Sequence, residues 1–125
     1  MAFNDINDET IGQLISAFYA KARKDPDLGP IFSDHIGDDW DAHLKVIALF
    51  WSNVMLADGR YSGNPMSVHM KLSEVQPYHF KIWLDLFSQT ARELFVDEIA
   101  SAFVERAERI AQSLQIGMFE RLGSL

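Results

Sequence analysis

Apolar residues recur along the chain at intervals of three and four, the spacing of helices that bury one face. The first apolar stripe follows Asn7, a good N-cap, and has two acids in its first turn, so it predicts a helix over 8–24. No segment shows the strict alternation of a half-buried strand, and the chain is therefore expected to be all-α, with five or six helices. The residues of this first stripe are Ile11, Leu14, Ile15, Phe18 and Ala22.

Glycine and proline fall in two clusters, over 25–37 and 58–65, and divide the chain into separate helical segments. Within the first cluster, a short turn is expected around 31–32. A second helix is expected to begin among the aspartates that follow this cluster and to end at Gly59, because an apolar stripe fills the interval.

The second half of the chain predicts three further helices. Asn64, followed by proline, predicts a short helix over 65–72. Ser73 and Gln76 have the spacing of a capping box, so a new helix is expected to start there. A last helix is expected with Asp97 as its N-cap, although no glycine or proline marks its start. A helix as short as 65–72 buries little apolar area of its own, which suggests that a bound group holds it in place.

Length and composition narrow the class of protein. The 125 residues are enough for one domain over 1–125, and 48% hydrophobic with 23% charged residues is typical of globular proteins. The formal net charge of −7 disfavours binding to nucleic acid or to an anionic membrane. The chain has no cysteine, no apolar run of membrane-spanning length and no secretory signal pattern, so a cytoplasmic protein is expected.

Two of the four histidines are expected to point inward. His43 precedes Ile47 by one helical turn, and His69 lies one turn after Met66 and one before Leu72. A lone histidine on an apolar face is more often a satisfied core residue than a ligand. Two of them on different helices are more informative, because both need partners in an apolar interior.

Two polar aromatic residues, Tyr19 and Trp83, lie beside apolar stripes, yet each carries a hydrogen that needs a partner when buried. Together with the inward histidines they could form a small polar cluster in an apolar pocket. Such a pocket suits a large flat cofactor whose metal takes one strong protein ligand. A structural zinc site is disfavoured, because the chain has neither cysteine nor a His-Glu-x-x-His motif.

Four segments, in order, resemble a known family. They are FYAKARKDPDLGPIF over 18–32, HLKVIALFW over 43–51, YSGNPMSVH over 61–69 and HFKIWLDLF over 79–87. Together they resemble the group III branch of the bacterial truncated haemoglobins, over about residues 11–114. The chain also lacks the Gly-Gly pairs that end helices in the other truncated branches, as group III does.

The resemblance implies a truncated globin fold, a helical sandwich around haem b, with His69 as the proximal iron ligand. Tyr19 and Trp83 would donate hydrogen bonds to a diatomic ligand, and His43 would occupy the distal histidine position. The ring would be lined by Phe32, Ile47 and Phe50, with Tyr61 and Met66 near its edge. The candidates for contact with the haem propionates are Lys71, Arg60 and Lys45.

The implied function is reversible binding of oxygen, nitric oxide, carbon monoxide or similar molecules at a five-coordinate iron. Two donors in a dry pocket should slow oxygen release, which suits redox chemistry or sensing better than bulk transport. The chain could instead be an enzyme, a nitric oxide dioxygenase or a peroxidase-like protein, which would need electrons from a separate reductase. Two more distant possibilities are a cofactor-free helical module that binds a basic partner and a non-haem metal protein that uses the same histidines.

Overall fold

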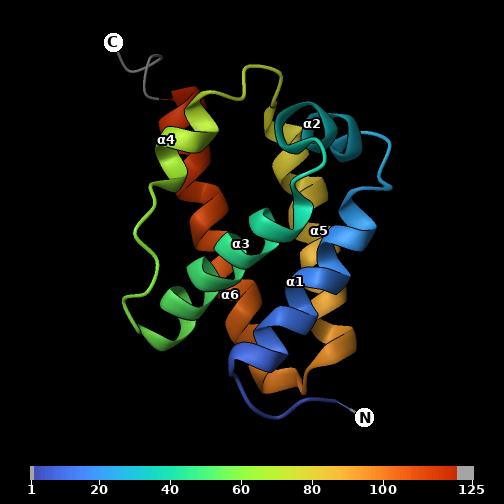
Figure 1. The fold of residues 1–125 in the computed structure, drawn as a ribbon, viewed down its shortest axis with the longest axis vertical. Coiled ribbons are helices and arrows are strands. Elements are labelled where there is room, and N and C mark those ends of the chain that lie inside the picture. The colour runs from blue at the N-terminus through green and yellow to red at the C-terminus, as the bar shows by residue number, and fades with distance from the viewer. Residues whose placement is uncertain (1, 121–125) are drawn as a thin grey trace.

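The computed structural model of the chain describes residues 2–120, which form six α-helices and a terminal π-helical turn (Figure 1). The predicted all-α class is confirmed. The elements are α1 (Asp8–Ala22), α2 (Leu28–Ile36), α3 (Trp40–Leu56), α4 (Pro65–Met70), α5 (Pro77–Leu94), α6 (Asp97–Gln115) and η1 (Ile116–Glu120).

The predicted starts of two helices are confirmed by their caps. The Asn7 side chain accepts a hydrogen bond from the Thr10 backbone N–H at 3.0 Å, and Asn64 does the same for Ser67 at 3.1 Å. Each bond satisfies one of the backbone donors that a helix start leaves without a partner. Both helices end two residues earlier than expected.

The turn expected around 31–32 is wrong, because these residues lie inside α2. Pro30 is the third residue of α2, where a missing N–H breaks no bond within the helix. Asp25 accepts from the backbone N–H of Leu28 at 2.9 Å at the start, and Gly37 ends the helix with a φ of +64°. Proline therefore helps to start this helix and does not interrupt it.

The predicted capping box of Ser73 with Gln76 is also wrong. Gln76 is the N-cap of α5, and its reciprocal partner is His79. The last helix begins one residue earlier than predicted, because Asp97 is its first residue and Val96 occupies the N-cap position expected for Asp97. The break before it is made by the N-terminal segment, because Phe3 donates to the Leu94 carbonyl at 2.7 Å and accepts from Val96 at 2.9 Å.

Aromatic packing joins α1, α3, α5 and α6 in one core. The Trp51 and Trp83 rings both stack against the Phe87 ring, with centroid distances of 4.9 and 5.2 Å, and Phe18 meets Phe87 edge-on at 5.5 Å. In Figure 1, α5 and α6 run along the long axis and α4 lies beside the end of α6. None of the helices in residues 2–120 is long and apolar enough to cross a membrane.

Candidate functional site

A cavity of about 400 Å³ lies between the helices, and all six contribute to its wall. Most of the lining is aliphatic or aromatic, which is typical of sites for large apolar ligands. The polar lining side chains are Tyr19, His35, His43, Tyr61, His69, Lys71, His79 and Trp83. All four histidines of the chain therefore reach the same cavity.

His69 comes from α4 and is half-buried in the cavity wall. Its Nδ1 lies 2.7 Å from the carbonyl oxygen of Pro65, four residues earlier. A carbonyl only accepts, so Nδ1 carries a proton, and in the neutral form of the ring Nε2 has a free lone pair. This is the arrangement in which metal-ligating histidines are held by a neighbouring acceptor. His69 thus presents one neutral nitrogen ligand to the cavity.

Tyr19 and Trp83 bring hydrogen-bond donors to the same cavity from α1 and α5. Burial raises the pKa of Tyr19 far above its usual range, and the nearby indole N–H of Trp83 offsets this only in part. The phenol therefore remains protonated and able to donate. Phe18 packs edge-on against both rings, with centroid distances of 4.8 and 5.7 Å, and fixes their positions.

His43 lines the cavity from α3 and is half-buried. Burial lowers its pKa from the usual value of 6.5, and the nearby Asp39 carboxylate partly opposes this. The imidazole is therefore neutral at pH 7. Trp40 meets it edge-on at 6.0 Å and is itself covered by the Arg23 guanidinium, 4.3 Å above the indole ring.

The apolar residues expected around a ring are mostly brought together. Phe32, Ile47, Phe50 and Tyr61 all line the cavity. Met66 is not part of the lining and packs instead in a second apolar cluster with the end of α6 and with η1. The sequence pattern did not predict η1. It therefore could not predict that one face of α4 packs against η1 while another lines the cavity.

Of the three basic residues expected near an anionic edge, Lys71 lines the cavity and Lys45 does not. Arg60 also lies elsewhere, because its guanidinium donates to the Asp8 carboxylate at 2.6 and 3.2 Å, to Asp58 at 3.0 Å and to Ser52 at 2.6 Å. Hydrogen bonds to Arg60 and Ser52 lower the pKa of Asp8 and Asp58, respectively. This cluster fixes the loop between α3 and α4 to the start of α1.

Two histidines of the cavity were not expected there. His35 lies on the exposed end of α2 and pairs with Glu74 from the segment between α4 and α5. His35 reaches the cavity because α2 is helical, and the sequence did not predict this helix. His79 is 7% exposed and lies one turn before Trp83, a spacing that places both on one face of α5.

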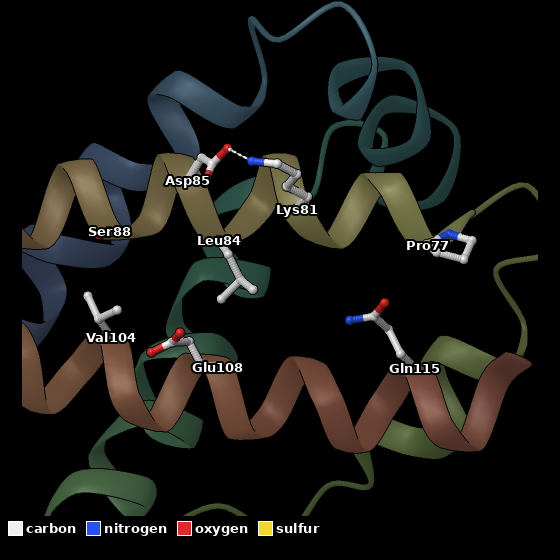
Figure 2. Close-up of a pocket in the computed structure, with 8 residues that line it drawn as sticks. All are labelled: Pro77, Lys81, Leu84, Asp85, Ser88, Val104, Glu108 and Gln115. Carbon is white, nitrogen blue, oxygen red and sulfur yellow. Dashed lines mark hydrogen bonds and ion pairs between the residues drawn. The ribbon is translucent and has the colours of Figure 1, made fainter. Parts of the chain in front are cut away.

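A second cavity, of about 320 Å³, lies between α5 and α6 (Figure 2). Leu84 and Val104 form its apolar part, and Lys81 pairs with Asp85 along α5 at 2.9 Å. It holds neither histidine nor an aromatic side chain. The first cavity is therefore the candidate site.

The donor set of the first cavity suits a metal that is already held by a flat ring. Over residues 2–120, no three or more His, Cys, Asp or Glu side chains gather closely enough to hold a metal ion. This disfavours a non-haem metal protein, which needs at least three protein ligands. A porphyrin iron needs only one imidazole and an apolar wall, and both are present.

No protein-family sequence model matches the chain. It is 38% identical to the group 3 truncated haemoglobin ctb of Campylobacter jejuni over 118 residues, which cover 92% of this chain and 93% of that protein. The chain belongs to the group III truncated haemoglobins. The crystal structure of a group III truncated haemoglobin from the same organism superposes with a TM-score of 0.92 at 36% identity, over 97% of this chain and 98% of that one.

Membership of the truncated haemoglobins confirms the fold predicted from the sequence, and it makes the chain a globin, a family of haem proteins. The cavity combines one imidazole nitrogen with an apolar wall, and these are the features that a haem site needs.

Proposed function

We propose that the chain, as a single globin domain over 1–125, binds haem b in the cavity with His69 as the only protein ligand to a five-coordinate iron. The observation that carries this proposal is the hydrogen bond from His69 Nδ1 to the Pro65 carbonyl at 2.7 Å. This bond directs the ring, fixes its tautomer and leaves Nε2 free for the metal.

Haem held by His69 would supply an iron able to bind oxygen, nitric oxide or carbon monoxide. Tyr19 and Trp83 donate hydrogen bonds to the ligand, and Phe18 holds both donors in place. His43, neutral because burial lowers its pKa, is the third polar group that can reach the ligand. Phe32, Ile47 and Phe50 exclude water from the ring and so strengthen each hydrogen bond.

These donors determine what the protein can do with oxygen. A hydrogen bond to a charged acceptor in a dry site is worth about 1.5–3 kcal/mol, and 1.4 kcal/mol corresponds to a tenfold change in an equilibrium constant. Two donors therefore favour tight, slowly released oxygen. The proposed role is redox chemistry on the ligand, with electrons from a separate reductase, or sensing, and not bulk transport.

Replacement of the donors by Phe tests this proposal. Each of Tyr19→Phe and Trp83→Phe should accelerate oxygen dissociation by about tenfold or more, because each removes one hydrogen bond to a polar ligand. Carbon monoxide is less polar when bound and should dissociate at nearly the same rate as from the unaltered protein. Stopped-flow displacement of each gas measures both rates.

Tyr78→Phe is the matched control, because Tyr78 is 54% exposed and is not part of the cavity wall. It should leave both rates unchanged. Equal acceleration of oxygen and carbon monoxide in the Tyr19 and Trp83 variants would contradict the proposed role of the two donors.

A further inference from the structure

His79 is a buried polar residue of the cavity for which the proposed function gives no role. It lies in the first turn of α5, is 7% exposed and lines the cavity one turn before Trp83. A buried imidazole needs hydrogen-bond partners for both nitrogens.

One nitrogen of His79 has its partner within the helix cap. Nδ1 accepts a hydrogen bond from the Gln76 backbone N–H at 2.8 Å. An atom that accepts from an N–H carries no proton itself, so the neutral ring is protonated on Nε2. The two nitrogens point in different directions from the ring, and Nε2 therefore points away from the end of the helix.

The second nitrogen has no partner in the part of the chain that the structure describes. It is also not sealed in, because no side-chain nitrogen or oxygen of the described residues is both fully enclosed and without a partner. Since the residue is 93% buried and lines the cavity, Nε2–H is reached from the cavity. A donor is thus left for a group that enters this space.

His69 and His79 are held in opposite tautomers. His69 offers a lone pair on Nε2, and His79 offers an N–H on the same atom. A metal needs the lone pair, so His79 is suited to an acceptor and not to the iron. The strongest acceptors on haem b are its two propionate carboxylates.

We propose that His79 donates a hydrogen bond through Nε2–H to a propionate carboxylate of the bound haem. This inference rests on the proposed function, because it needs a porphyrin in the cavity. Two other features favour an anion there. Lys71 lines the same cavity, and the start of α5, an 18-residue helix, carries partial positive charge.

Two variants separate the hydrogen bond from the helix cap. His79→Phe removes both the donor and the cap acceptor. His79→Glu keeps an acceptor at the third helical position, where Glu normally caps, but has no donor. Each is loaded with haem b and, separately, with its dimethyl ester, and transfer of the porphyrin to an excess of a scavenging apoglobin gives the rate of loss.

The unaltered protein should retain haem b longer than the ester by about tenfold or more, the effect of a hydrogen bond to a charged group. His79→Phe should lose this preference, and His79→Glu should reverse it by repelling the carboxylate. The ester should leave all three proteins at similar rates. The preference is the ratio of the two loss rates in the same protein. A general loss of stability therefore affects both rates and leaves their ratio unchanged.

Lys81→Gln is the matched control, because Lys81 lies on the same helix, pairs with Asp85 and is not part of the cavity wall. This variant should keep the preference for haem b. If the His79 variants keep the full preference, or if the unaltered protein shows none, the propionate contact is overturned. A change in carbon monoxide dissociation with the preference intact would place the donor at the gas ligand instead. Failure of the unaltered protein to take up haem b at all would overturn the proposed function itself.

Discussion

The neighbours of each histidine decide what that residue can do in the cavity. His69 donates to a carbonyl and keeps a lone pair, whereas His79 accepts from an N–H and keeps a proton. His43 makes neither kind of bond with residues 2–120, and burial lowers its pKa. Sequence spacing predicted that His43 and His69 face inward. It could not assign tautomers, because those depend on backbone atoms whose position is set only by the folded helix ends.

The lowered pKa of His43 predicts a pH dependence of stability. Between the folded pKa and the unfolded value near 6.5, the unfolded chain binds more protons, so the free energy of unfolding falls as the pH falls through this range. Asp39 opposes the shift and reduces the effect. Below the pKa of His43 in the folded state, this residue causes no further decrease in the free energy of unfolding.

Urea unfolding of the haem-free protein between pH 7.5 and 5, compared with His43→Gln, measures this effect. The unaltered protein should lose more stability on acidification, with the difference growing by at most about 1.4 kcal/mol per pH unit, the limit for one titrating group. The other histidines are present in both proteins, so their contribution to the pH dependence of stability is the same in both. Parallel pH profiles would show that His43 is not desolvated in the folded state.

Among the α-helices, α4 is the shortest, yet it carries the proposed iron ligand His69. It has only six residues, and a helix of this length is not stable alone. Asn64 caps its start, Pro65 supplies both a fixed φ and the carbonyl that orients His69, and Met66 packs against η1. The sequence signal of Asn-Pro was strong enough to place α4, whereas the packing partner η1 gave no signal.

Loss of the α4 cap should therefore reach the metal ligand. Asn64→Ala should lower the free energy of unfolding by about 1 kcal/mol, the usual cost of a lost N-cap, and accelerate haem loss severalfold. Asn7→Ala is the matched control, because it removes the same kind of cap from α1, away from His69. Similar acceleration of haem loss by both variants would contradict a local effect of α4.

The α-helix that the sequence analysis missed, α2, shows how glycine and proline signals can conflict with tertiary contacts. Gly29 and Pro30 usually mark a turn, yet both lie in the first turn of α2. Gly29 is needed there because a Cβ would lie 2.6 Å from the Arg23 carbonyl oxygen. Pro30 is tolerated because its N–H would have no helical partner. Close contact with the end of α1 decides the structure, and such contact cannot be derived from composition.

In the molecule as a whole, all six α-helices contribute to one cavity, and so no single segment contains the site. Residues far apart in the chain, such as Tyr19 and Trp83, meet there because Phe18 and Phe87 pack α1 against α5. The apolar stripes predicted that these helices share a core. The resemblance to truncated haemoglobins predicted some of the polar residues that line it but not His35 and His79. Three residues that it placed around the haem, Lys45, Arg60 and Met66, do not line the cavity, and Arg60 and Met66 have local partners elsewhere.

The proposed function depends on His69 as the ligand to the haem iron, and replacement of His69 by glycine removes that ligand. Resonance Raman spectra of the ferrous protein should show an iron–imidazole stretching band that disappears in His69→Gly and returns when free imidazole fills the vacated space. The same substitution at His35 should leave the band unchanged, because His35 pairs with Glu74. A ferrous His69→Gly protein that keeps the original band without added imidazole would contradict the account.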